Sequence, residues 1–195
     1  MGARSAGIQK SRIAEGARPK RAGAPSTADA PRASSGKSAT GGARLDKWRF
    51  RIAAFAIIER EGMVMLARRR DIGWWNLPGG GLESGETVDE GLLREVREEV
   101  CAEVRVARLV GVYSKPQKNE VVLTFLCHLE HGQEEAIGTS DEVSEIGWFA
   151  PEALPVDLLP KHRQRVLDAF AGQLTPIMRA QRSSTEEDQK LTSAG

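Results

Sequence analysis

One segment of the chain constrains the fold more than any other: an amphipathic helix pattern that directly follows a glycine-rich loop. Apolar residues recur at helical spacing and lie on one face of this helix, at Val88, Leu92, Leu93, Val96 and Val100. Thr87 and Glu90 have the spacing of a capping box, so the helix is predicted to begin near Thr87. A helix with one apolar face has to bury that face against another element, which requires a layered fold.

Acidic residues gather on one flank of this predicted helix. Residues 83–103 contain eight acidic and two basic side chains, a local net charge of −6. At about 100° per residue, Glu95, Glu98 and Glu99 lie together beside the buried face. Like charges four residues apart destabilise a helix by roughly 0.2–0.5 kcal/mol unless a cation lies between them. Oxygen-rich clusters without thiolates suit Mg²⁺ or Mn²⁺, although a merely solvated charged face is the alternative.

The loop before the helix completes a motif. Residues 74–81 read Trp-Trp-Asn-Leu-Pro-Gly-Gly-Gly, and such glycines allow backbone groups to lie close to a metal ion or a phosphate. From the second glycine onward the chain resembles the signature box of the Nudix hydrolases, with every charged position of the box matched. The matching residues are Gly80, Glu86, Arg94, Glu95, Glu98 and Glu99.

Two residues depart from the pattern of the box. Cys101 replaces a glycine, and Ala102 replaces a bulky aliphatic residue. Because that glycine usually adopts a left-handed conformation after the helix, we expect Cys101 either to be strained by about 1–2 kcal/mol or to end the helix differently. Neither residue is a metal-ligand type in the box, so the departures concern the helix end and its stability rather than the chemistry.

The resemblance implies hydrolysis of a diphosphate that joins a nucleoside to another group, with Mg²⁺ or Mn²⁺ required. It makes Glu98 and Glu99 the principal metal ligands and the carbonyl of Gly80 a further ligand. Glu95 is either a ligand or the base that deprotonates the attacking water. The metal would neutralise the repulsion between the glutamates and an anionic diphosphate.

Other residues are assigned supporting roles. The resemblance implies that Arg94 pairs with Glu86 and holds the loop against the helix. Glu145, like the nearby Glu142, is a candidate for an additional acid near the metal. Four residues are candidates for substrate binding, by charge, by stacking or by position: Arg68, Arg70, Trp75 and Glu142.

The sequence indicates the identity of the substrate less closely than the type of reaction. Pro116 lies shortly after the box, near the place where a proline is typical of family members that hydrolyse ADP-ribose. This favours ADP-ribose or a sugar nucleotide. A nucleoside triphosphate pyrophosphohydrolase is the alternative enzyme, and a catalytically silent nucleotide-binding module of the same fold is the alternative outside enzymes.

The rest of the pattern predicts the fold class. Strands are expected at residues 49–58, 63–69, 104–113, 121–129 and 143–149, and a second helix at 159–172. The first two strands, separated by Glu61 and Gly62, suggest a hairpin. Strands mixed with helices indicate an α/β or α+β fold. The resemblance narrows this to a Nudix α/β/α sandwich with a mixed central sheet, the acidic helix and a C-terminal helix.

Charge and composition divide the chain into three parts. The net charge of +1 conceals a segment, residues 1–44, with nine basic and two acidic side chains and little apolar content. We expect residues 1–44 to be a disordered basic extension, residues 45–174 the Nudix domain, and residues 175–195 a flexible tail.

The composition also limits location and partners. The longest apolar run has seven residues, too short for a membrane span, and two cysteines cannot form a disulfide framework. A reducing, cytoplasmic setting is therefore expected. The expected partner is a nucleotide-type small molecule, with no membrane and with nucleic acid bound at most weakly through the basic extension. A homodimer is plausible for so small a domain.

Overall fold

A long first strand organises the sheet in the computed structural model, which describes residues 49–182. Strand β1 (Arg51–Arg60) runs parallel to β6 (Glu120–Leu129), and β6 runs antiparallel to β5 (Val104–Lys115). Strand β8 (Ile177–Ala180) lies parallel to β5 at the edge. The sheet is therefore mixed, as expected. The disorder predicted for residues 1–44 lies outside the described residues.

The other edge of β1 is shared by two different strands. Its last two residues pair with β2 (Met63–Arg69) through a two-residue turn at Glu61 and Gly62, both with positive φ. The predicted hairpin is confirmed, but its β1–β2 ladder is short, because β2 turns away to pair with β3 (Trp75–Asn76) and β7 (Val143–Phe149). The vacated edge of β1 pairs instead with the glycine strand β4 (Gly79–Gly81).

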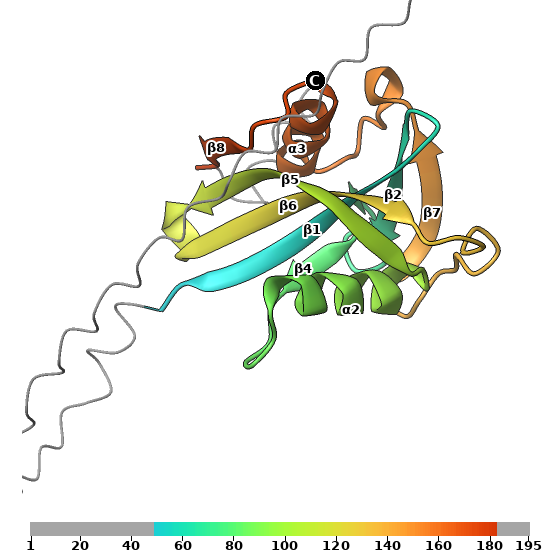
Figure 1. Cartoon of the computed structure of the whole chain (residues 1–195), viewed down its shortest axis with the longest axis horizontal. Helices are drawn as coiled ribbons and strands as arrows, with labels where there is room; N and C mark the ends of the chain where they lie inside the picture. The colour runs from blue at the N-terminus through green and yellow to red at the C-terminus, as the bar shows by residue number, and fades with distance from the viewer. Residues whose placement is uncertain (1–48, 183–195) are drawn as a thin grey trace, which may run out of the picture. The chain divides into compact units, whose positions relative to one another are not determined.

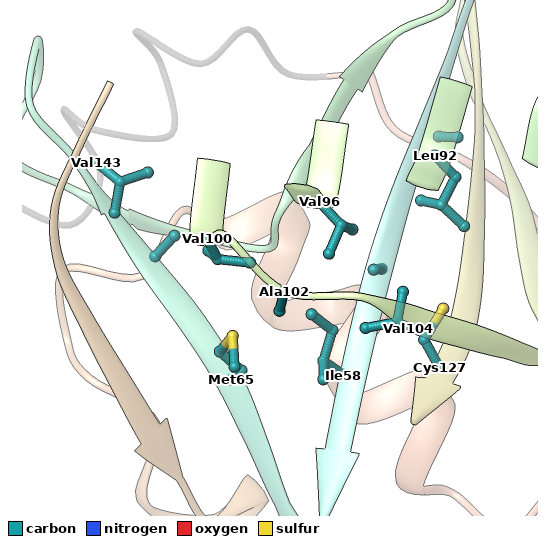
Figure 2. Packing of buried hydrophobic residues seen from close by; sticks show 12 residues of the cluster. Ile58, Met65, Leu92, Val96, Val100, Ala102, Val104, Cys127 and Val143 are labelled. Atoms are coloured by element: carbon teal, nitrogen blue, oxygen red, sulfur yellow. The ribbon is translucent and has the colours of Figure 1, made fainter. Parts of the chain in front are cut away.

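Two helices cover opposite faces of the sheet, as Figure 1 shows. Helix α2 (Val88–Val100) packs its apolar face on one side of β1, where Leu92, Val96 and Val100 are fully buried. Figure 2 shows these three side chains above Ile58, Met65, Val104 and Cys127. Helix α3 (Pro160–Phe170) buries Val166 on the other face, against Ile57 of β1. The α/β/α sandwich is confirmed.

Short elements connect the larger ones. Two 3₁₀ turns, η1 (Pro116–Lys118) and η2 (Pro151–Ala153), each begin with a proline, whose fixed φ favours a first helical position. Within residues 49–182 there is no helix that is long and apolar enough to cross a bilayer.

The end of the chain differs from the prediction. Residues 175–195 were expected to form a flexible tail, but Ile177–Ala180 form strand β8, and Gln181 after it is buried. Three contacts with α3 secure this segment: Arg179 pairs with Asp168 at 3.0 Å, the buried Arg165 donates to Gln181 at 2.8 Å, and Gln181 donates to the carbonyl of Lys161 at 3.1 Å. A four-residue strand that is mostly exposed and carries a single polar residue, Arg179, shows no alternation of apolar and polar residues, so only these distant contacts reveal it. Residues 183–195 lie outside the described part of the chain.

Helix α2 ends at Cys101 in a strained backbone conformation, which was one of the two expected outcomes. Cys101 has φ 55° and ψ 26°, which is left-handed, and its N–H donates to the carbonyl of Arg97. A residue with a Cβ is destabilised in this conformation by roughly 1–2 kcal/mol. Ala102, the other departure, is buried in the core beneath α2, where a larger aliphatic side chain would need more space.

Replacing Cys101 by glycine is expected to stabilise the protein by about 0.5–1 kcal/mol, because relief of the strain outweighs the greater freedom of glycine in the unfolded chain. Urea unfolding followed by circular dichroism measures the change. Cys101→Ala is the matched control, since it removes the thiol and keeps the left-handed strain. Equal stability of the glycine and alanine variants would contradict the strain.

Candidate active site

The site is built on two glycines that lie in very close contact with their neighbours. Gly79 has φ 129° and lies so near the backbone of Ala54 that any side chain would collide with it. A Cβ added to Gly80 would lie 2.6 Å from Oε2 of Glu95, closer than van der Waals contact allows. These contacts let helix α2 approach strand β4 closely enough for its carboxylates to reach the strand.

The glutamates of α2 that lie near this strand differ in how far they are buried. Glu99 is buried and its Oε2 accepts a hydrogen bond from the N–H of Gly79 at 2.9 Å. Glu95 lies over Gly80 with its side chain 19% exposed, whereas the side chain of Glu98 is 60% exposed. The structure thus brings the three glutamates to the same flank of the helix, with Glu98 closest to solvent.

Arg94 connects the glutamates to the loop before the helix. Its guanidinium pairs with Glu86 at 2.6 Å, as expected, and donates to the carbonyl of Gly81 at 3.2 Å. It also donates to Glu95 and Glu98, each at 3.1 Å. The hydrogen bonds from Arg94 and from the N–H of Glu83 lower the pKa of Glu86 to about 2. Arg94 therefore holds loop and helix together by contacts that a point charge such as lysine would not reproduce.

Burial makes the carboxyl groups at the glycine strand harder to ionise. The pKa of Glu99 is raised to about 7, mainly by burial and further by the charges of Glu95 and Glu142, against the lowering effect of the Gly79 hydrogen bond. The pKa of Glu95 is also raised, again mainly by burial, despite its hydrogen bond with Arg94. A cation bound next to such desolvated carboxyl groups would favour their ionised form.

The residues present suit a hard divalent cation. The candidate donors are all oxygens, from Glu95, Glu98, Glu99 and the carbonyl of Gly80, and Mg²⁺ and Mn²⁺ prefer such donors. The Glu95 carboxylate occupies the place that a side chain at Gly80 would take, so this carboxylate lies directly against the glycine strand. In residues 49–182 no three His, Cys, Asp or Glu side chains are already grouped as ligands, and Arg94 instead bridges Glu95 and Glu98.

The glutamates form one end of a cavity of about 860 Å³. Arg70 and Glu142, two predicted substrate residues, line it. The guanidinium of Arg70, however, donates to the carbonyls of Ser140, Asp141 and Val143, so it mainly holds the loop that carries Glu142.

The other two predicted substrate residues lie away from the cavity. Trp75 is 5% exposed and packs edge-on against Phe149 in the core, with ring centroids 5.0 Å apart. Arg68 donates hydrogen bonds to Glu145 and to Asp157, so its positive charge is already paired with carboxylates of the protein. The assignments of Trp75 and Arg68 to substrate binding are therefore corrected. Adjacent strand residues point to opposite faces, and it is Arg69 that lines the cavity. Glu145, the alternative extra acid, is paired with Arg68 and is likewise not among the lining residues.

Several lining residues were not predicted from the sequence. Asn76 lines the cavity, and its buried Oδ1 has no hydrogen-bond partner among the described residues, which leaves an acceptor for a ligand. His162 of α3 also lines it, with Nδ1 accepting the N–H of Leu77 at 3.0 Å. Asn76 belongs to the glycine-loop motif, which was a usable signal. His162 had none, because it is 85 residues from the backbone group that it contacts.

The family comparison matches most of the described residues. The model of the NUDIX domain matches residues 49–170. The chain is 31% identical over 120 residues to a Bacillus subtilis protein named "Putative 8-oxo-dGTP diphosphatase", covering 61% of this chain and 79% of that protein. It is 32% identical over 111 residues to the ADP-ribose pyrophosphatase of Methanocaldococcus jannaschii, covering 53% of this chain and 64% of that protein.

A solved structure agrees in fold. The NUDIX hydrolase from Nitrosomonas europaea superposes with a TM-score of 0.61 at 25% identity, and the match covers 68% of this chain and 79% of that chain. The sandwich described above is therefore shared with a solved member of this group of proteins.

His162 is expected to make stability fall in mildly acidic solution. Burial, and then the positive charges of Arg165, Lys115, Arg69 and Lys161, hold its pKa well below the ordinary 6.5. The folded protein keeps the imidazole neutral, whereas the unfolded chain takes up a proton below pH 6.5, so acid favours unfolding. Between pH 7.5 and 5.5 the contribution of His162 to the free energy of unfolding should decrease by about 1.4 kcal/mol.

Urea unfolding of the wild type and of His162→Gln at both pH values measures this contribution. Other titrating groups are common to the two proteins, so the difference between them isolates His162. A difference that stays constant between the two pH values would show that the folded protein also takes up this proton.

Proposed function

The chain belongs to the NUDIX family, and we propose that it hydrolyses the diphosphate bond of a nucleoside diphosphate linked to a second group. The observation that carries the proposal is the convergence of Glu95 and Glu99 on the glycine strand at one end of a large cavity. Buried carboxyl groups with raised pKa values are typical of catalytic sites. The cavity is large enough for a nucleotide-sized ligand.

In the proposed reaction, different residues of this chain bind the metal, accept a proton and position the carboxylates. Glu95, Glu98, Glu99 and the carbonyl of Gly80 would hold Mg²⁺ or Mn²⁺, which supplies the positive charge that offsets repulsion between carboxylates and diphosphate. Glu95 is a ligand or the base that takes a proton from the attacking water. Arg94 positions Glu95 and Glu98 and, through Glu86, orders the loop that precedes α2.

ADP-ribose or a sugar nucleotide is the favoured substrate class. The name of the Methanocaldococcus relative and the proline at position 116 support it. The alternative is a nucleoside triphosphate, cleaved to a monophosphate and pyrophosphate, which the name of the Bacillus relative supports. Release of AMP from ADP-ribose and release of pyrophosphate from a panel of deoxynucleoside triphosphates, each with Mg²⁺ and with Mn²⁺, separate the two.

A silent nucleotide-binding module is the alternative outside enzymes. The presence of Glu95, Glu98 and Glu99 together argues against it, and hydrolysis of any nucleotide in the panel would exclude it. A cytoplasmic setting remains part of the proposal, supported by nucleotide-type substrates and by two cysteines, both free thiols.

Removing one ligand charge is expected to lower turnover by orders of magnitude without unfolding the domain. Glu98→Gln and Glu99→Gln should each lower kcat by at least about a hundredfold, because the carboxylate charge is lost while the size of the side chain is kept. Steady-state hydrolysis and thermal unfolding measure the two effects. Glu103→Gln is the control, since Glu103 pairs with Arg97 beyond the end of α2 and is not a lining residue. Near-full activity of both variants would reject the metal-site assignment.

A further inference from the structure

The cavity has a second end whose charge is opposite to that of the glutamates. Arg51, Lys115, Lys118 and Glu120 line it there, which gives these four residues a net charge of +2. Arg51 and Lys118 are exposed, so their charges are available to a ligand in the cavity. None of these residues belongs to the box that marks the glutamate end.

The sheet keeps the two ends of the cavity apart. Across the sheet the strands follow the order β4, β1, β6 and β5, so the glycine strand and Lys115 are separated by two intervening strands. Neighbouring strands lie about 4.8 Å apart, which places these ends roughly 14 Å from each other. A diphosphate held at the glutamates is therefore too short to reach Lys115 and the adjacent Lys118, which have to contact another part of the substrate. Arg51, on β1 beside the glycine strand, lies between the glutamates and these lysines.

An ion pair and backbone pairing between strands hold the basic end in place. Nζ of Lys115 pairs with Oε2 of Glu120 at 2.6 Å, with both side chains about 15% exposed, at the last register pair of β5 and β6. Arg51 lies opposite Glu120 in the β1–β6 register, and Lys118 lies in the turn η1 between β5 and β6. Because Glu120 is already paired with Lys115, two positive charges remain around a fixed ion pair.

A buried arginine adds positive electrostatic potential near the basic end of the cavity. Arg165 is fully buried, and its Nε and Nη1 have no hydrogen-bond partner among the described residues. Its guanidinium lies 5.1 Å from the ring of Phe55, which lines the cavity, and 5.3 Å from that of Tyr113. Leu159 and His162, at the N-terminus of α3, also line the cavity, and Leu159 provides no side-chain cap, so the positive end of this helix dipole lies at the cavity.

From this arrangement we infer that the basic end binds a phosphate monoester of the substrate, remote from the diphosphate that is cleaved. A phosphate dianion matches the net charge of +2 and accepts hydrogen bonds from both Arg51 and Lys118. The inference rests on the proposed function for the position of the diphosphate. It narrows the substrate class to nucleoside diphosphate derivatives that carry a further phosphate.

Two pairs of compounds that differ by one phosphate test the inference: ADP-ribose with its 2′-phosphate, and dephospho-coenzyme A with coenzyme A. Isothermal titration of the Glu98→Gln variant measures affinity without turnover. In at least one pair, the phosphorylated compound should bind roughly three- to tenfold more tightly, and added salt should reduce this ratio.

Variants of the basic end locate the effect. Lys118→Gln and Arg51→Gln, each made in the Glu98→Gln background, should lower the ratio toward one. Arg105→Gln is the matched control for Arg51, because Arg105 is an exposed strand arginine that is not a lining residue. Equal binding within both pairs, or a ratio that both variants leave intact, would overturn the inference.

The same measurements separate this inference from the proposed function. If the wild type hydrolyses all four compounds with equal kcat/KM and the Glu98→Gln variant binds them equally, the function stands and the phosphate site is rejected. If the wild type hydrolyses no nucleotide but the ratio of affinities remains and depends on Lys118 and Arg51, the site stands and the hydrolase proposal is rejected.

Discussion

The contact between Gly80 and Glu95 is the constraint on which the rest of the site depends. Because the Glu95 carboxylate occupies the place of a side chain at residue 80, helix α2 can lie directly against strand β4. The same approach puts Glu99 within hydrogen-bond distance of the Gly79 N–H and lets Arg94 reach the Gly81 carbonyl. Its energetic consequence is the desolvation of Glu95 and Glu99, which is the main reason that the pKa of each carboxyl group is raised.

The division of β1 between two partners explains where this contact can form. If β2 had followed β1 along its whole length, the edge would have been filled by a regular hairpin. Since β2 leaves after two paired residues, the glycine strand pairs with the first half of β1 and brings the loop to the sheet. The cavity then extends across β1 and β6 to Lys115, so a strand order set by backbone pairing also separates its acidic and basic ends.

Much of the fold followed from local patterns, and the exceptions share one cause. The helix from Val88 and the strands at residues 63–69 and 143–149 were predictable because alternation and capping are encoded by near neighbours. Strands β4 and β8 were not, because three glycines and a short, mostly exposed segment carry no periodic signal. Trp75 and Arg68 were assigned to the substrate by residue type, and their actual contacts, Phe149 and Asp157, are distant in sequence.

By itself, the sequence determined the acidic helix, its spacing from the glycine loop and hence the family, because these features depend on residues within one continuous segment. It also determined that Cys101 would stand where a glycine is favoured, but the structure decided that the residue is strained rather than rearranged. Only the tertiary structure decided that His162, Lys115 and Arg51 share a cavity with the glutamates. Their proximity results from strand order and helix packing, which no local pattern encodes.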